Sequence, residues 1–149
     1  MRRKDKEVFD IEEMKSILDE ADTCHMALVD DGEPYIVALN YGYAWTGKNP
    51  VLYFHCAKEG RKLDILRRKP EVCFIIDCHH ELIRGREACQ WSMKYRSLVG
   101  SGSVDFIQAG EERKRGLDLL MAHYGASDAG EYTEAVYTRI EMLRLKVRL

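Results

Sequence analysis

Residues 51–68 read VLYFHCAKEGRKLDILRR, and this stretch decides the fold because a strand, a tight turn and a helix follow one another in it. Its first residues are apolar, aromatic and β-branched, which favours a buried strand that closes at His55 and Cys56. Gly60 interrupts the apolar pattern, and leucine and isoleucine recur after it at helical spacing. The stretch therefore predicts a strand and then a short helix over residues 61–69.

Two basic residues, Arg61 and Lys62, lie in the first turn of the predicted helix. Acidic residues are usual there, because the unpaired backbone N–H groups already make that end of a helix positive. Free N–H groups, two cations and the close approach that Gly60 permits have the composition of a phosphate-binding turn. The alternative is that both cations are solvated and that Gly60 serves only the turn. The local chemistry does not decide between the two interpretations.

Length and charge limit the classes of function. A chain of 149 residues predicts one domain, residues 1–149, which can bury enough surface to fold without disulfides. Lys and Arg number 23 against 25 Asp and Glu, so no global field favours nucleic acid. The basic cluster at residues 2–6 is interpreted as a solvated N-terminus, and no apolar run follows it. We therefore expect neither a signal peptide nor a transmembrane helix, and a cytoplasmic location.

The five cysteines are an odd number without a framework spacing, which argues against a secreted disulfide architecture. Cys73 and Cys78 flank an apolar run, and His79 and His80 follow it, which raises the question of a metal site. Zinc ligands usually come in closer pairs, and the two ends of a predicted strand would point apart. We therefore expect reduced cysteines and no metal.

The part of the chain before the deciding stretch predicts a helix and an antiparallel meander. A D-x-x-E capping box and a periodic apolar face predict a helix over residues 9–21. Strands are expected over residues 24–29 and 35–43, with tight turns between them and into the strand at residue 51. Asn40 falls inside the second strand, where a buried polar side chain needs a hydrogen-bond partner, either the backbone or a ligand.

The remaining elements are expected in the order strand, loop, strand, helix, loop and strand. Their predicted ranges are residues 71–77, 78–94, 95–106, 111–124, 125–132 and 135–149. The near-continuous apolar run of the first of these strands indicates burial on both faces. The long polar segment that follows is expected to be an irregular loop near a site or a subunit boundary.

Two of these strands contain irregular patterns. The sequence Gly-Ser-Gly-Ser at residues 100–103 indicates a bulge, or a place where a ligand or another backbone approaches closely. In the last strand, the apolar residues up to Met142 and those from Leu143 onward are out of phase. A bulge between Met142 and Leu143 is expected to reconcile the two phases.

Three segments carry a resemblance to a known family: PYIVALNYGY at residues 34–43, LYFHCAKEGRKLDILRRKPEVCF at residues 52–74 and YRSLVGSGSV at residues 95–104. They resemble the pyridoxamine 5'-phosphate oxidase-related flavoproteins, and most closely the branch named for nitroimidazole resistance. The similarity runs from residue 1 to about residue 124 and includes the opening MRRKDKE. The resemblance implies a mainly β fold with peripheral helices, an antiparallel split β-barrel of the FMN-binding type.

The resemblance also implies a cofactor site. In that family the corresponding turn holds the phosphate of FMN, or of the FMN half of FAD, and the barrel forms a homodimer with the cofactor at the interface. The residues expected at the cofactor are Asn40, His55, Cys56, Gly60, Arg61, Lys62, Arg96 and Ser97. His55 is expected to contact the cofactor rather than to act as a base, because nothing near it in the sequence orients it. No catalytic residue is assigned.

The resemblance implies a flavin-dependent oxidoreductase that reduces a small acceptor such as a nitroaromatic compound, with the chemistry supplied by the flavin. Oxidation of pyridoxamine phosphate itself is not expected, because the arginine-rich C-terminal substrate motif of those oxidases is not recognisable in residues 135–149. One alternative is a non-catalytic protein that sequesters flavin or haem, with His55 or the pair His79 and His80 as iron ligands. The other is a structural or regulatory barrel with an empty pocket.

Overall fold

The structure is a computed structural model that describes residues 10–126 and 130–149, so the basic cluster at residues 2–6 lies outside the described residues. The described elements are α1 (Ile11–Glu20), β1 (Cys24–Asp30), β2 (Glu33–Leu39), β3 (Gly42–Thr46), β4 (Asn49–Ala57), α2 (Arg61–Arg68), β5 (Glu71–Ile83), the 3₁₀ helix η2 (Ala88–Gln90), β6 (Ser92–Phe106), α3 (Glu111–His123), α4 (Glu134–Arg139) and β7 (Ile140–Arg148). No helix within these two ranges is long and apolar enough to cross a membrane.

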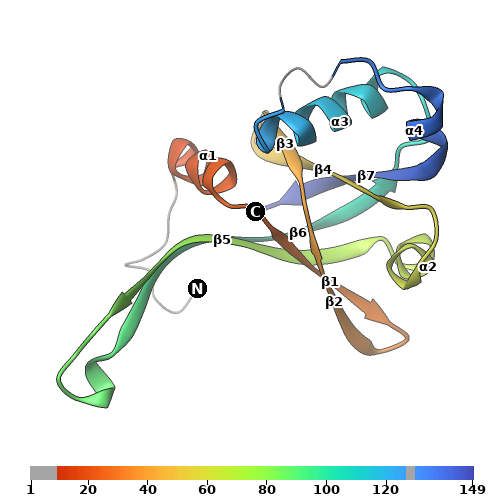
Figure 1. Ribbon diagram of the computed structural model, residues 1–149. Helices are drawn as coiled ribbons and strands as arrows, with labels where there is room; N and C mark the ends of the chain where they lie inside the picture. Colours follow the sequence, from red (N-terminus) through yellow and green to blue (C-terminus); the bar gives the residue numbers. More distant parts are fainter. Residues whose placement is uncertain (1–9, 127–129) are drawn as a thin grey trace.

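The strands form one sheet in the order β2-β1-β5-β6-β7-β4-β3, and every neighbouring pair is antiparallel. The sheet curls around a core of buried apolar side chains, with the helices at its periphery (Figure 1). Strands β2 and β3 are the two edges, and no ladder joins them in the described part of the chain. The barrel is therefore split rather than closed, and the expectation of a mainly β, antiparallel split barrel with peripheral helices is confirmed.

Several elements begin and end as their own residues predict. The carboxylate of Asp10 accepts a hydrogen bond from the N–H of Glu12 at 3.1 Å and so caps α1. Asp31 and Gly32 have φ angles of 49° and 95°, the left-handed conformations of a two-residue turn, and this turn joins β1 to β2. The predicted helices over residues 61–69 and 111–124 are α2 and α3.

The strand predicted over residues 35–43 is wrong, because the chain leaves β2 before residue 40 and begins β3 at Gly42. β2 pairs with β1 at one edge of the sheet and β3 pairs with β4 at the other, so no continuous meander forms. Tyr41 lies at the break, where its ring is buried and its hydroxyl donates to the carbonyl oxygen of Leu18 at 2.7 Å. A Cβ at Gly42 would lie 2.4 Å from the backbone nitrogen of Leu120, so only glycine lets α3 lie this close to the corner.

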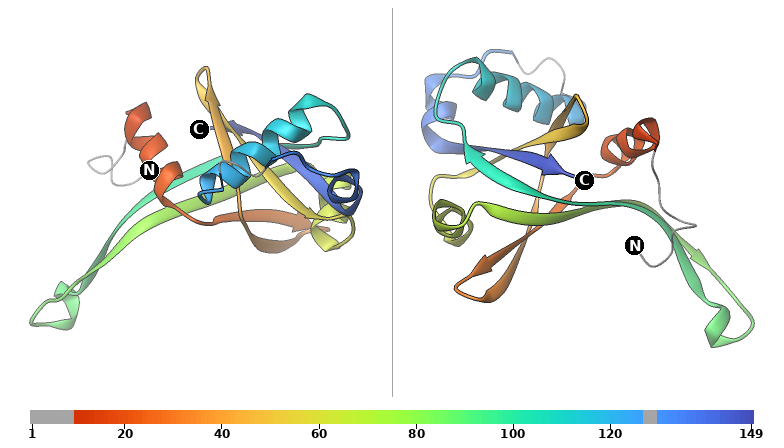
Figure 2. Two further views of the ribbon diagram at one scale, coloured as in Figure 1. Left: turned by 45° about the horizontal axis from the view of Figure 1, so that its top comes forward. Right: turned by 180° about the vertical axis from the view of Figure 1, so that it is seen from behind.

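The irregular loop predicted over residues 78–94 is confined to residues 84–91, and the rest of the range is strand, contrary to expectation. β5 continues to Ile83 and β6 begins at Ser92, and the two strands form an arm that extends away from the barrel (Figure 2). Almost all residues of the arm are exposed on both faces. The arm therefore lacks the apolar alternation that marks a half-buried strand, which is why the sequence pattern did not reveal it.

β5 buries only one face within a single chain, so the predicted burial on both faces is not reached by the described chain alone. Cys73 and Ile75 are exposed, whereas the residues that alternate with them point into the barrel. Although α1 contacts β5, Cys73 and Ile75 on its outer face remain exposed in the described part of the chain. An apolar strand that faces solvent in one chain is a typical site for contact with another chain.

The last part of the chain also differs from the prediction. Its first residues form α4, and β7 begins only at Ile140. The pairing of β7 with β4 is continuous from Ile140 to Lys146, so there is no bulge between Met142 and Leu143. Both faces of β7 are covered: Leu143 and alternate residues after it lie in the barrel, and Met142 lies in a second cluster beneath α3. Apolar residues in both phases are therefore explained by burial on both faces.

Two glycines of β6 allow neighbouring groups of the same chain to approach closely: a side-chain ring at Gly100 and, as predicted, another stretch of backbone at Gly102. A Cβ at Gly100 would lie 2.8 Å from the ring of Phe74, and one at Gly102 would lie 2.2 Å from the carbonyl oxygen of Lys146. The pairing of β6 with β5 is regular at both residues. Of the two expected alternatives, the close approach is correct and the bulge is not.

Candidate functional site

The turn between β4 and α2 has the geometry of an anion-binding helix N-terminus. Gly60 has a φ of 139°, which disfavours any other residue, and no heavy atom lies within 4 Å of the place where a Cβ would be. Its carbonyl oxygen accepts the N–H groups of Leu63 and Asp64 at 2.9 and 3.3 Å. In the described ranges the two preceding N–H groups, those of Arg61 and Lys62, have no backbone acceptor.

The side chain of Arg61 is held against the turn between β1 and β2. Its Nε donates to Asp30 Oδ2 at 2.9 Å, and Nη2 lies 3.7 Å from Glu33 Oε2. The guanidinium also lies over the ring of Tyr35, 4.6 Å from its centroid. Asp30 additionally accepts a hydrogen bond from Arg68 at 2.6 Å, so one carboxylate ties both ends of α2 to the hairpin.

Lys62 differs from Arg61 in having no carboxylate partner in the described part of the chain. Its side chain is half-buried, and its ammonium favours the thiolate of the neighbouring Cys56. Burial has the larger effect on that thiol and raises its pKa, so Cys56 stays protonated near neutral pH. Cys56 also points into the barrel core, which leaves mainly its backbone available to a ligand.

His55 lies one residue earlier on β4 and on the opposite face, level with Met142 of β7. Partial burial lowers the pKa of its imidazole, so the ring is neutral at pH 7. Its ring makes no hydrogen bond within residues 10–126 and 130–149. A neutral imidazole with both nitrogens free can donate one hydrogen bond to a ligand and accept another.

The other predicted residues lie elsewhere in the chain. Asn40 is exposed at the corner between β2 and β3. Arg96 and Ser97 are on β6, where they line a cavity of about 1120 Å³ between α1 and the base of the arm. Arg96 donates to Ser16 Oγ at 2.6 Å and so binds α1 to β6. This cavity shares no lining residue with the turn before α2, so a single chain does not gather all the predicted residues around one cavity.

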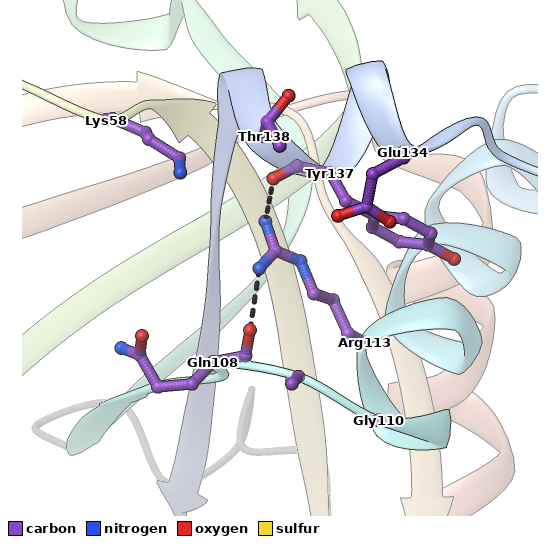
Figure 3. Close-up of a pocket in the computed structure, with 8 residues that line it drawn as sticks. Lys58, Gln108, Gly110, Arg113, Glu134, Tyr137 and Thr138 are labelled. Carbon is purple, nitrogen blue, oxygen red and sulfur yellow. Dashed lines mark hydrogen bonds between the residues drawn. The ribbon is translucent and has the colours of Figure 1, made fainter.

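A smaller cavity of about 390 Å³ opens beside the turn (Figure 3). Lys58 of the turn is on one side of it, and Glu134 of α4 is on the other. Between them, Arg113 is 9% exposed and donates to the carbonyl oxygens of Gln108 at 2.8 Å and Tyr137 at 2.6 Å. The guanidinium thus fixes the start of α3 to the end of α4 and gives this cavity a basic floor.

The sequence patterns did not single out Lys58, Asp30 or Arg113. One signal for Arg113 was available, because it lies four residues before Leu117 and therefore on the apolar stripe of its helix. The pairing of Asp30 with Arg61 had no such signal, since it depends on how α2 packs against the β1–β2 hairpin.

The chain was also compared with known proteins. Residues 10–149 match the protein-family model of pyridoxamine 5'-phosphate oxidase. The solved structure of a candidate 5-nitroimidazole antibiotic resistance protein from Bacteroides thetaiotaomicron is 31% identical, with a TM-score of 0.81 over 95% of this chain and 82% of that chain. No match was found among the curated proteins.

Two more distant structures share the fold. An FAD and heme binding protein from Mycobacterium smegmatis is 21% identical, with a TM-score of 0.78 over 95% of this chain and 68% of that chain. An FAD-binding protein from Mesorhizobium loti is 20% identical, with a TM-score of 0.61 over 95% of this chain and 91% of that chain.

The split antiparallel barrel and the open helix N-terminus beside it define the class of protein, the split-barrel proteins related to pyridoxamine 5'-phosphate oxidase. The chain belongs to the pyridoxamine 5'-phosphate oxidase family. The family predicted from the three sequence segments is therefore confirmed.

Proposed function

We propose that this protein is a flavin-binding oxidoreductase that holds FMN, or FAD through its FMN portion. The turn before α2 carries the proposal, because two free backbone N–H groups, the open space at Gly60 and the half-buried Lys62 lie together there. Such N–H groups bind phosphate through hydrogen bonds and the helix dipole. The cation of Lys62, which has no carboxylate partner in the described ranges, adds a charge-assisted bond.

The residues around the turn fit the rest of a flavin. Arg61 can keep its bond to Asp30 and still present other N–H groups to the phosphate, since a guanidinium has five donors. In this proposal His55, neutral and without an internal partner in the described chain, forms hydrogen bonds to the ribityl chain or the ring system. Cys56 contributes its backbone.

The remaining predicted residues lead us to propose a homodimer. Asn40, Arg96 and Ser97 lie apart from the turn, and in this proposal Arg96 and Ser97 complete the site of a second copy. The outer face of the sheet supports such an assembly, because Ile36 and Val99 are each 64% exposed on it. The arm supports it too, since a two-stranded ribbon is marginal without further packing.

When bound, the flavin supplies hydride and electron transfer, while the residues of the chain bind it, orient it and exclude water. We propose small electron acceptors, 5-nitroimidazoles or other nitroaromatic compounds, on the strength of the 31% identity to the Bacteroides thetaiotaomicron protein. A phosphorylated substrate has less support, because Arg144 and Arg148 of β7 are already paired with Glu112 and Glu71.

The first experiment is the ultraviolet–visible spectrum of the purified protein, followed by denaturation and identification of any released cofactor. We expect a two-band flavin spectrum, either as purified or after FMN or FAD is added. Anaerobic reduction with NADPH and reoxidation by a nitroimidazole then tests the oxidoreductase, whereas flavin that binds but does not turn over indicates a sequestering protein. A Soret band would replace flavin by haem, and a colourless protein that binds neither flavin would overturn the proposal.

A further inference from the structure

Three metal-ligating side chains meet at the base of the arm, away from the turn that precedes α2. Glu20 lies at the C-terminal end of α1, and Cys78 and His79 lie where β5 leaves the barrel. One ligand atom from each of the three residues lies within 4.8 Å of the others. They offer a carboxylate, a thiol and an imidazole, which is a mixed set of donors rather than a patch of acidic residues.

The backbone of β5 is shaped to bring two of these donors to one side. Neighbouring residues of a regular strand point to opposite faces, so Cys78 and His79 would ordinarily diverge. The pairing of β5 with β6 shifts between Cys78 and Glu81, which is a bulge, and His79 has a left-handed φ of 56°. As a result, His79 Nε2 contacts the carboxylate of Glu20 on the side where Cys78 is buried. A non-glycine residue in this conformation is unusual and often marks a functional site.

Arg96 holds the carboxylate of Glu20 in its orientation toward His79. Arg96 Nη1 lies 3.4 Å from Glu20 Oε1, while Oε2 contacts His79. Arg96 is itself fixed to α1 by its bond to Ser16 Oγ at 2.6 Å. A hydrogen-bonding partner that orients a ligand in this way is typical of the residues that surround metal ligands.

We propose that Glu20, Cys78 and His79 bind a divalent transition-metal ion, for which Zn²⁺ is the best match. Thiolate, imidazole and carboxylate are the ligands of zinc, with bond lengths of about 2.0–2.3 Å. Ligand atoms around such a tetrahedral ion lie roughly 3.3–3.8 Å apart, so His79 and Glu20, which are in direct contact, must move apart to admit the ion between them and Cys78. Three protein ligands leave the fourth position to water or to a small molecule from the adjoining large cavity.

This site differs from the one considered from the sequence spacing. Cys73, the obvious partner of Cys78, is exposed on the other face of β5 and contributes nothing. The third ligand comes from α1, which the fold and not the spacing places beside β5. The metal ligands are not residues of the turn before α2, but Arg96, which orients Glu20, is also one of the residues proposed to complete the flavin site of a second copy.

Titration with Co²⁺ tests the site in the full chain under reducing conditions, with spectra recorded as differences from the metal-free sample so that any flavin absorbance cancels. We expect one ion per chain, a thiolate-to-cobalt charge-transfer band and displacement of the cobalt by Zn²⁺. The exposed ligands are changed in Glu20→Gln and His79→Ala, and each change should weaken binding by at least about tenfold. Cys78→Ser should abolish the charge-transfer band.

Two variants serve as matched controls. Cys73→Ser removes an exposed thiol of the same strand, and His80→Ala removes the neighbouring imidazole, which pairs with Asp77 instead. Both should bind cobalt as the unchanged protein does. If no cobalt–thiolate band appears, or if Glu20→Gln and His79→Ala bind as tightly as the unchanged protein, the proposal is wrong. Because Glu20 and His79 are exposed, their variants decide the matter even if Cys78→Ser fails to fold.

Discussion

At the scale of single residues, the two cations of the turn before α2 are not equivalent. Arg61 already donates to Asp30, whereas Lys62 has no carboxylate partner in the described part of the chain. We expect Lys62→Ala to weaken FMN binding about 10- to 100-fold, because one charge-assisted hydrogen bond contributes roughly 1.5–3 kcal/mol. Arg61→Ala should have a smaller effect in the same direction. Fluorescence titration of FMN with the flavin-free protein measures both.

Lys48→Ala is the control, since Lys48 is an exposed lysine in the turn between β3 and β4. It changes the net charge by the same amount and should leave the affinity for FMN unchanged. If Lys48→Ala and Lys62→Ala weaken FMN binding equally, the effect comes from the net charge of the protein and not from a contact between Lys62 and the phosphate. Unchanged affinity in both Lys62→Ala and Arg61→Ala would remove the turn from the phosphate site.

At the scale of elements, Arg144 joins three of them. It lies on β7, donates to both oxygens of Glu112 on α3 at 2.6 and 2.8 Å, and donates to Asp105 on β6 at 2.8 Å. Arg144→Met leaves two acids without this partner, and we expect it to lower the free energy of unfolding by about 1–3 kcal/mol. Arg148→Met removes an exposed pair with Glu71 and should cost only about 0–1 kcal/mol. Urea unfolding of both variants makes the comparison.

The same network predicts a dependence on pH. Hydrogen bonds from Lys146 and Arg144 lower the pKa of Asp105 below its ordinary value of 3.8. The ionised carboxylate therefore stabilises the fold fully above that value, and this contribution is lost as the pH falls through the pKa of the folded state. The difference in stability between the unchanged protein and Arg144→Met should accordingly shrink in acid. A difference that stays constant from neutral pH to about pH 3 would show that Asp105 contributes nothing.

The sequence predicted elements whose boundaries depend on their own residues. Asp10 caps α1 and Gly60 opens α2, and both effects are local. Sequence reasoning failed where the chain makes a distant contact: at the break after the second strand, the hydroxyl of Tyr41 donates to a carbonyl oxygen of α1. The arm was not predicted for another reason: in a two-stranded ribbon exposed on both faces, apolar and polar residues need not alternate.

The candidate site shows the same division. The sequence singled out Gly60, Arg61 and Lys62 as candidates through their position at a predicted helix start, and the structure places all three at the turn before α2. It could not identify Asp30 as the partner of Arg61, or bring Glu20 to His79, since both contacts depend on the packing of α2 and α1 against the sheet.

At the scale of the whole molecule, the exposed apolar surface is the feature that a single chain leaves unexplained. Ile75 and Val99 face each other across β5 and β6 on the outer face of the sheet, and both are exposed. The arm adds more exposed apolar side chains at Leu82, Trp91 and Met93. An apolar sheet face and a projecting ribbon are more stable in contact with a second copy of the chain than exposed to water.

Val99→Asp tests the proposed homodimer. A charge at the centre of an apolar interface loses its hydration on association, so we expect the dimer to weaken by at least about 100-fold. Val136→Asp, at an exposed apolar position on α4 away from this face, should leave the assembly unchanged. Sedimentation velocity measures the assembly, and circular dichroism verifies that both variants fold, as exposed positions should allow. If the site is shared between two chains, Val99→Asp must also weaken FMN binding, although the residue lies apart from the turn before α2. A monomer that binds FMN as tightly as the unchanged protein would show that one chain holds the flavin alone.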